Sequence, residues 1–322
     1  MKKTPFLKKL SIGLGLFVAL SLVSLSVSSQ NLSITASLGG SNLLSDLNAG
    51  YIPPYKADFS LGATYDINNR LRGRANISFP TVAADDANSP NAGVKNRNLN
   101  VKTNIQELAL LFEGDIVDNE NSSVIPYGFV GGAVYHFVPH PLNPIDSLGD
   151  VDLHSIGTEG QYLPSGKYAD RQYKLTQLNV QFGLGVRVEF SSNVSLAFEG
   201  TYRKLFTDYL DDASAKSYIL KPEWEEGIQT ALQQGNTGLA NRLKLAEAYS
   251  WRYIDSKGNA VPLPSTNPGI GFKRGNPESK DVFFSFQLRL NVRLENLFFS
   301  SDLYTPTNRT GRGQLRNPGR VF

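Results

Sequence analysis

The chain has 322 residues, with 32 Lys and Arg against 29 Asp and Glu, and it contains no cysteine. This near-balance of charge argues against nucleic acid as a partner, and the lack of cysteine excludes a disulfide framework, thiol catalysis and thiolate metal sites. The 29 glycines, 14 tyrosines and 18 phenylalanines are instead typical of a β-barrel with aromatic belts.

Residues 1–29 have the pattern of a secretory signal peptide, with an apolar run over 12–27 and small residues at Val27-Ser28-Ser29 before the expected cleavage point. A membrane anchor is the alternative, but the run is short and rich in Ser and Gly. Cleavage would leave 28 basic against 29 acidic residues, because the leader carries four lysines and no acid. Its basic residues are Lys2, Lys3, Lys8 and Lys9.

Eight stretches of the remaining chain alternate apolar and polar residues with the period of a β-strand. They are 32–38, 57–67, 70–79, 101–113, 127–137, 178–190, 194–203 and 282–294. The pair 178–190 and 194–203, joined by Ser191-Ser192-Asn193, is typical of a hairpin. These strands reach about ten residues, the length that a tilted strand needs to cross a bilayer.

An even count of eight strands predicts an all-β fold, an eight-stranded antiparallel transmembrane β-barrel covering residues 30–296. Short turns at Asn68-Asn69 and 191–193 alternate with long connections over 39–56, 80–100, 138–174 and 205–281. Since short turns are periplasmic in such barrels, we expect long extracellular loops, periplasmic termini and contact with outer-membrane lipids. In 127–137 we expect Tyr127, Phe129, Ala133, Tyr135 and Phe137 to face lipid and His136 to face inward.

The opposite parity places charged residues inside the barrel, six of each sign. They are Arg72, Arg74, Arg187, Arg203, Arg289 and Arg293 against Asp66, Glu107, Glu113, Glu189, Glu199 and Glu295. An eight-stranded barrel is only wide enough for side chains, and confined charges must pair to offset the cost of desolvation. We therefore expect a plugged bore rather than a diffusion channel.

The fourth long connection is too long to lack structure of its own. Pro222 and the acids after it are typical of a helix start, and apolar residues recur at helical spacing on both sides of Gly235. The pattern predicts a small helical insertion at about 221–249, either a hairpin capping the outer mouth or a single bent helix.

Acidic residues on the loops raise two chemical hypotheses. The first is a calcium site formed by Glu159, Asp208, Asp211 and Asp212, since hard cations prefer several oxygen ligands. The structural alternative is that these carboxylates pair with Arg274 or cap turns. The second hypothesis is acid–base catalysis by Glu159 and an aspartate, but His136, His140 and His154 lie in no nucleophile motif. We expect no enzymatic activity and no cofactor.

Residues 297–322 are rich in Gly and Pro and carry four arginines against Asp302. The composition predicts a flexible basic periplasmic tail. It is either a free end that touches anionic surfaces or a docking peptide that orders on a partner. The candidate contacts are Arg309, Arg312, Arg316 and Arg320.

Short polar motifs on the loops carry a resemblance to a known family. Residues 157–161, 173–177, 207–212 and 274–277 resemble the signature stretches of a Bacteroidota outer-membrane barrel family that includes PorG, a component of the Type IX secretion apparatus. The resemblance implies a non-enzymatic barrel of the secretion and gliding machinery. It also implies contact with a periplasmic ring of the PorK lipoprotein and PorN, and with other secretion-system subunits.

Two alternatives to this anchoring role remain at the level of sequence. One is a barrel unrelated to secretion, whose long loops recognise a ligand or partner at the cell surface. The other is an integral membrane hydrolase or acyltransferase. Fold alone does not choose among them, because function depends on the chemistry of particular sites.

Overall fold

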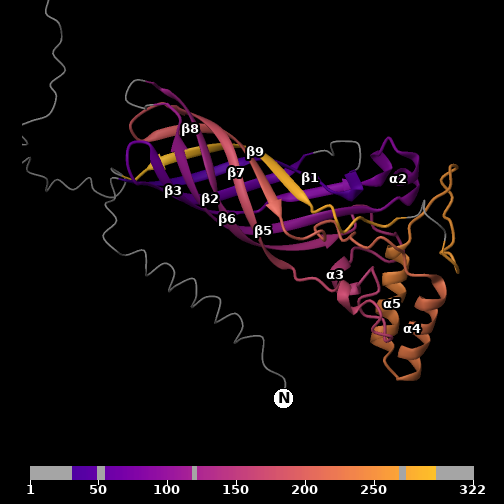
Figure 1. Cartoon of the computed structure of the whole chain (residues 1–322). Coiled ribbons are helices and arrows are strands. Elements are labelled where there is room, and N and C mark those ends of the chain that lie inside the picture. The colour runs from indigo at the N-terminus through magenta and orange to yellow at the C-terminus, as the bar shows by residue number, and fades with distance from the viewer. Residues whose placement is uncertain (1–30, 49–54, 118–121, 268–272, 295–322) are drawn as a thin grey trace, which may run out of the picture.

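A computed structural model describes residues 31–48, 55–117, 122–267 and 273–294, and its main feature is one antiparallel sheet (Figure 1). The sheet order is β3-β2-β1-β9-β8-β7-β6-β5-β4, and an additional pairing of β3 with β5 closes it into a barrel. The strands are β1 (Leu32–Leu44), β2 (Lys56–Asp66), β3 (Leu71–Ser78), β4 (Thr81–Asp85), β5 (Asn100–Asp115), β6 (Val124–His140), β7 (Thr176–Glu189), β8 (Val194–Leu205) and β9 (Val282–Arg293).

The short strand β4 follows β3 after a break at Phe79-Pro80 and pairs with the first residues of β5. Proline has no backbone N–H to donate, so the ladder is interrupted there. β3 and β4 pair with different ends of β5, so together they occupy the position of one strand in the wall. The nine strands therefore form an eight-stranded barrel. The predicted eight-stranded antiparallel barrel is confirmed, but β4 was not predicted and lies in a segment expected to be a loop.

The outer wall of the barrel is apolar. Leu110 and Phe112 on β5 are each 66% exposed, and Leu38 on β1 and Leu184 on β7 are exposed by 69% and 68%. Their neighbours in sequence point inward, as the period of two requires, and apart from Leu111 they are polar or small. A water-facing surface would not keep large apolar side chains in this pattern around a closed sheet, and the pattern is the one expected of lipid contact.

Strand β6 has the opposite orientation from the one predicted. Tyr127, Phe129 and Tyr135 are buried inside the barrel, as are Ala133 and Phe137, whereas His136 faces outward. Apart from His136 and His140, both faces of β6 consist of glycine, proline, aliphatic and aromatic residues, so alternation of polarity could not fix its parity. The inward rings of Tyr127 and Phe129 fit because the neighbouring strand has Gly185 and Gly183 opposite them, where a Cβ atom would collide with each ring.

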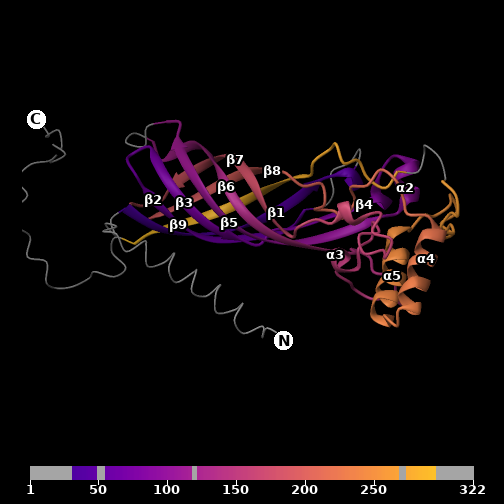
Figure 2. The ribbon, with the colours of Figure 1, turned by 60° about the horizontal axis from the view of Figure 1, so that its bottom comes forward.

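At one end of the barrel the strands are joined by short turns, and at the other end the longer connections pack together (Figure 2). We call the described residues 42–48, 80–104, 138–175, 205–267 and 273–281 the loop body. Its helical segments are η3 (Asp46–Asn48), η4 (Asp86–Asn88), α2 (Ala92–Arg97), α3 (Leu153–Ile156), η5 (Ala169–Arg171), α4 (Lys221–Gln233) and α5 (Thr237–Ser250).

A single apolar core joins the loop body to the loop end of the barrel. Trp224 and Leu243 from the helices, Leu210 from the connection after β8 and Phe137 from β6 all belong to it and are almost fully buried. Burying a large apolar side chain contributes about 1.5–3 kcal/mol. The long connections are therefore folded, and their core is continuous with the loop end of the barrel.

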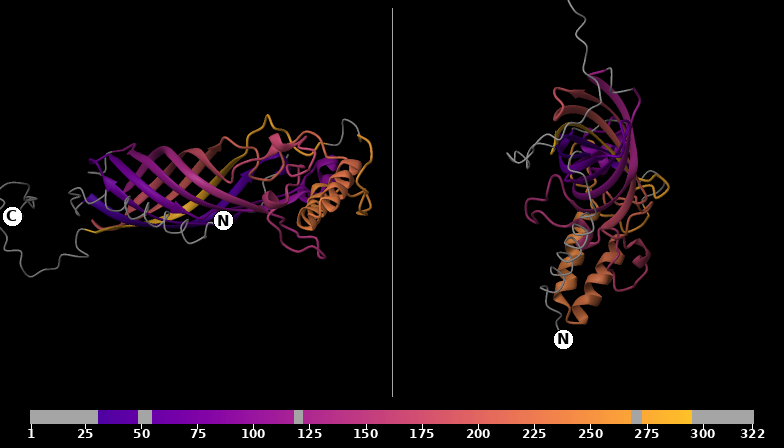
Figure 3. Two further views of the ribbon diagram at one scale, coloured as in Figure 1. Left: turned by 90° about the horizontal axis from the view of Figure 1, so that it is seen from below. Right: turned by 90° about the vertical axis from the view of Figure 1, so that its left-hand side faces the viewer.

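The insertion expected at about 221–249 is a pair of helices, α4 and α5, packed against each other. Asn236 caps α5 by accepting a hydrogen bond from the backbone N–H of Leu239, and Gly235 takes the positive φ of 70° at the connection. The hairpin does not cap the mouth. It extends to one side of the barrel axis (Figures 1 and 3), and its apolar residues pack against the rest of the loop body.

No helix in residues 31–48, 55–117, 122–267 and 273–294 is long and apolar enough to cross a membrane. The predicted signal peptide over 1–29 and the predicted basic tail over 297–322 lie outside the described residues, as does the predicted interior acid Glu295.

Candidate functional site

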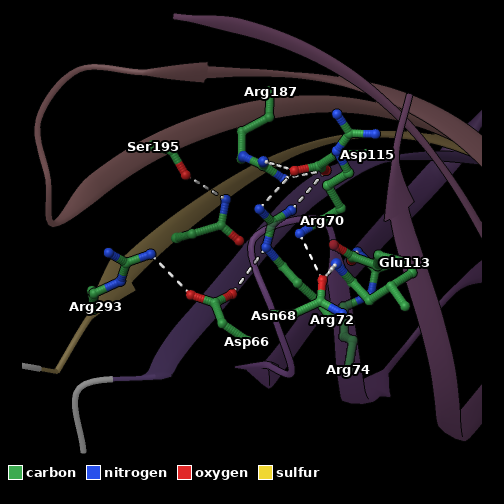
Figure 4. A network of polar contacts seen from close by, with 12 residues as sticks. Asp66, Asn68, Arg70, Arg72, Arg74, Glu113, Asp115, Arg187, Ser195 and Arg293 are labelled. Carbon is green, nitrogen blue, oxygen red and sulfur yellow. Dashed lines mark hydrogen bonds and ion pairs between the residues drawn. The ribbon is translucent and has the colours of Figure 1, made fainter. Parts of the chain in front are cut away.

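The barrel interior is filled by ionic groups, and the first of them lies at the turn end (Figure 4). Arg72 donates to both oxygens of Asp115 at 2.9 and 2.8 Å, and its Nε donates to Asp66 at 2.9 Å. Arg187 reaches the other side of Asp115 at 2.8 Å, and Arg293 reaches Asp66 at 2.9 Å. The side chain of Asp115 is fully buried, so the hydrogen bonds from Arg72 and Arg187 take the place of its hydration.

The second group lies further along the bore and is centred on two glutamates. Arg74 contacts Glu113 at 2.8 Å and Glu199 at 2.6 Å, while Arg289 contacts Glu113 at 2.5 Å and Glu199 at 3.1 Å. The Tyr127 hydroxyl donates to Glu199 at 2.5 Å. Two arginines and two glutamates share one dry site, which balances its charge.

A third group lies towards the loop end. Arg203 donates to Glu107 at 3.0 Å and to the Ser285 hydroxyl at 2.8 Å, and Glu107 also accepts from Asn179 at 2.8 Å and from Ser78 at 3.0 Å. A further buried carboxylate, Asp58, lies near Arg203. The polar face of the strands is thus linked across the bore from the turns to the loop body.

The structure places eleven of the twelve interior residues predicted from the sequence in or beside these three groups, with Glu189 at the rim beside Arg187 at 3.3 Å, and the twelfth, Glu295, lies outside the described residues. The eleven are Arg72, Arg74, Arg187, Arg203, Arg289, Arg293, Asp66, Glu107, Glu113, Glu189 and Glu199. A cavity at the turn end measures about 40 Å³, room for a few water molecules at most. In the part of the chain that the structure describes, ion pairs therefore cross the bore at three levels.

Sequence reasoning missed three members of the interior network, Asp58, Asp115 and Tyr127. Asp115 lies beyond the predicted strand 101–113, although it stands on the same parity as Glu107 and Glu113, and following the alternation one step further would have found it. Tyr127 was assigned to the lipid face with the rest of β6. Only the three-dimensional arrangement brings its hydroxyl to Glu199.

A second polar centre lies in the loop body around Arg274, which is 3% exposed. Its guanidinium donates to Glu159 at 3.1 Å, to the Thr158 hydroxyl at 2.9 Å, and to the backbone oxygens of Ser250 and Asp212 at 2.8 and 3.0 Å. Glu159 also accepts hydrogen bonds from the backbone N–H groups of Ser214 and Ala215. We call Thr158, Glu159, Tyr173, Asp212 and Arg274 the arginine hub.

All four of the motifs selected from the sequence therefore meet at one place. The chain can pack this closely because Gly275 lies against the backbone of Ala213, where a Cβ atom would be 2.5 Å from the carbonyl oxygen. Asp212 itself adopts a positive φ of 58°, a conformation that aspartate tolerates better than most residues. The hub is a structural joint between the β6–β7 and β8–β9 connections of the loop body.

Tyr173 links this hub to an aromatic stack. Its hydroxyl donates to Asp212 at 2.8 Å, and its ring stacks on Tyr209 with centroids 4.2 Å apart. Burial raises the pKa of Asp212 to about 6, even though Arg274, the Thr158 hydroxyl and the Tyr173 hydroxyl each lower it. Burial beside Asp212 also raises the pKa of Tyr173, so the hydroxyl stays protonated and remains a donor.

A second buried arginine ties α2 to the hub. Arg97 donates to both oxygens of Asp86 at 2.7 Å, and to the backbone oxygen of Arg274 at 2.7 Å. Burial raises the pKa of Asp86 to about 6 against the opposing effect of Arg97. Neither residue was selected from the sequence, because they stand eleven positions apart in a connection that offered no periodic signal.

The predicted calcium set does not come together. Glu159 and Asp212 pair with Arg274, as the structural alternative expected, whereas Asp208 and Asp211 lie elsewhere in the loop body. Within the described residues, no three His, Cys, Asp or Glu side chains are arranged to hold a metal ion. The four carboxylates fail as a site because a fixed guanidinium already neutralises two of them.

Replacing Tyr173 by Phe is expected to destabilise the loop body by about 1.5–3 kcal/mol, because it removes a hydrogen bond to a buried charged acceptor and keeps the stacked ring. Both tryptophans of the chain, Trp224 and Trp251, are buried in the loop body. Their fluorescence during denaturant unfolding therefore reports on this part alone. Tyr162→Phe is the matched control, since no hydrogen bond of its hydroxyl to a described residue is found. An equal unfolding midpoint for both variants would contradict the role of Tyr173.

Comparison with known proteins gives one family match and several solved structures of low similarity. A family described as a domain of unknown function (DUF6089) matches residues 13–140. No curated protein matches the chain in sequence. Similar solved structures include Neisserial surface protein A, with 9% identity, a TM-score of 0.38, and coverage of 83% of this chain and 97% of that chain.

Two further structures have the same kind of likeness. The attachment invasion locus protein Ail of Yersinia pestis, in complex with the heparin analogue sucrose octasulfate, is 10% identical with a TM-score of 0.35, covering 81% of this chain and 97% of that chain. A major outer membrane protein from Thermus thermophilus is 12% identical with a TM-score of 0.36, covering 81% and 99%. At these identities the likeness concerns the fold alone.

Proposed function

We propose that the chain is a non-enzymatic outer-membrane β-barrel that anchors a protein complex at the membrane. The observation that carries this proposal is the combination of an apolar outer wall with an interior closed by ion pairs. An apolar wall suits residence in lipid, and a filled bore leaves the barrel no transport path of its own. A barrel of this kind can hold the loop body and the tail at a membrane surface.

The complex we propose is the Type IX secretion and gliding machinery, in which the barrel contacts the periplasmic ring of PorK and PorN. Support comes from the resemblance of the four loop motifs and from the basic tail that follows β9. β9 ends at the same end of the barrel as the short turns. If this end is periplasmic, Arg309, Arg312, Arg316 and Arg320 lie on the side of the ring and suit an acidic partner surface.

A second candidate is supported by the loop body, which is folded at the opposite end around the core that it shares with the barrel. Ordered loops on a rigid barrel are well suited to recognition, since little conformational entropy is lost on binding. In this function the loop body, and not the tail, binds a ligand or partner at the cell surface. The exposed charges of the helical hairpin, among them Glu226 and Lys244, are the contacts to test.

Truncation after Asn296 is expected to reduce the recovery of ring proteins in a crosslinked pull-down from membranes by at least about tenfold, which corresponds to about 1.4 kcal/mol. The control variant keeps the tail and carries Glu226→Lys with Lys244→Glu on the hairpin. Outer-membrane fractionation of all three proteins checks that each reaches the membrane. Recovery that survives truncation and fails in the hairpin variant would replace the anchoring function by the second candidate.

A further inference from the structure

Four aspartates from two connections gather in the loop body, separate from the arginine hub. Asp46 belongs to η3 after β1, Asp208 and Asp211 follow β8, and Asp281 immediately precedes β9. Asp208, Asp211 and Asp281 are each no more than 3% exposed, and Asp46 is half-buried. Each of the three buried carboxylates is close enough to Asp46 and to another of the set to feel its charge.

None of the four forms an ion pair with a residue that the structure describes. Neither oxygen of Asp208 makes a well-formed hydrogen bond to a described residue, and the same holds for Oδ2 of Asp211. The adjoining segments 49–54 and 268–272 contain no Lys or Arg in their sequence. Buried carboxylates without a cation are costly when ionised, and in practice such groups hold a proton instead.

The other charged and titratable groups around the cluster are few. Arg97 acts on Asp46 and Asp211 from α2, and Lys280 acts on Asp208 from the segment before β9. Glu159 adds negative charge on the side of the hub, and Tyr135 faces Asp281 from β6. The hydroxyls of Ser45 and Ser214 lie beside Asp211 and Asp208. Arg97 is already held by Asp86, so the cluster has an excess of negative charge whenever it is fully ionised.

We propose that Asp46, Asp208, Asp211 and Asp281 form a proton-dependent latch that holds the β1–β2 connection to the two ends of the β8–β9 connection. The segments are already in contact through backbone groups of the same region. The N–H of Leu210 donates to Asp281 at 2.8 Å, the N–H of Ala213 donates to Asp211 at 3.0 Å, and the N–H of Asn276 donates to Asp46. A neutral cluster leaves these contacts in place, and an ionised cluster drives the same segments apart by repulsion.

The direction of the pH dependence follows from proton uptake. Burial, with the neighbouring carboxylates, raises the pKa of Asp208 to about 7 and raises the pKa values of Asp211 and Asp281 well above their usual range. The closed loop body therefore binds protons more tightly than an opened one, in which aspartate titrates near 3.8. The closed form is fully stable below about pH 4, and it loses stability as the pH rises through 7.

The test uses the full chain reconstituted in vesicles, with denaturant unfolding followed by the fluorescence of Trp224 and Trp251 at pH 5 and pH 8. We expect the unfolding midpoint to fall from pH 5 to pH 8, with local opening at least tenfold more frequent at pH 8. Asp208→Asn and Asp281→Asn, alone and together, copy the protonated side chain. Each is expected to raise the midpoint at pH 8 and to flatten the pH dependence. Asp170→Asn, on the exposed η5, is the control and should behave as the parent chain.

Two results would overturn the latch. The first is a midpoint in the parent chain that stays constant or rises between pH 5 and pH 8. The second is a midpoint at pH 8 that calcium chloride raises, that EDTA lowers again, and that no longer responds to calcium in Asp208→Asn. That result would make the cluster a cation site and not a proton latch. The single variants keep the test decisive if the double variant does not fold.

Discussion

Glu113→Leu is expected to destabilise the barrel by about 3–5 kcal/mol, because the change leaves a positive charge uncompensated in the dry interior. Glu113 contacts Arg74 at 2.8 Å and Arg289 at 2.5 Å, and all three side chains are at most 1% exposed. After the substitution, Glu199 is the one carboxylate of this group left to pair with Arg74 and Arg289. Unfolding in urea from lipid vesicles, followed by the heat-dependent mobility of the folded barrel on gels, measures the effect.

The double variant Glu113→Leu with Arg289→Leu separates charge from packing. It restores one arginine to one glutamate in this group, so we expect it to be more stable than Glu113→Leu alone by at least about 1 kcal/mol. A purely steric effect would make the two substitutions add. Additive losses would therefore contradict the view that pairing of charge, and not shape, holds the interior together.

Leu110→Arg is expected to cost about 2–4 kcal/mol in a bilayer, the range for a basic residue near the middle of the apolar belt. Leu110 is 66% exposed on β5, between Leu108 and Phe112, which face the same way. In detergent the loss should be smaller, because a micelle adapts to the charge more readily than a bilayer. The measurement is the unfolding free energy in vesicles of defined lipid composition.

Leu232→Arg is the matched control for this prediction. Leu232 is 41% exposed on α4, in the loop body and away from the barrel wall. Surface substitutions of this kind usually stay within about 0.5 kcal/mol. If Leu110→Arg is as mild as Leu232→Arg in vesicles, the outer wall does not contact the lipid interior.

Strands with one polar and one apolar face were predictable, and strands with two apolar faces were not. On β7 the inward residues Asn179, Gln181 and Arg187 are polar, so parity was unambiguous and the prediction is confirmed. On β6 the inward residues include Tyr127, Phe129 and Tyr135, and the other face is mostly glycine and valine. The choice between them depends on Gly183 and Gly185 of the neighbouring strand, which sequence alternation does not register.

The loop body shows a similar division. Helical spacing predicted α4 and α5, because a period near 3.6 is visible over two turns or more. Arg274, Glu159 and Asp212 were recognised as polar motifs, but their junction depends on contacts across 62 and 115 positions. No local pattern reports such distances. The strand β4 was missed for a related reason, since five residues after a proline are too few to show alternation.

The central claim is that the barrel wall faces lipid, and the most direct test is lipid quenching along β5. The chain contains no cysteine, so one introduced cysteine carries one fluorescent label. In vesicles of bromine-labelled lipid, labels at Leu108, Leu110 and Phe112 are predicted to be strongly quenched. Labels at Gln229 and Lys244 on the hairpin are predicted to remain unquenched. Unquenched labels at all three β5 positions, in protein that is folded and bound to the vesicles, would contradict the account.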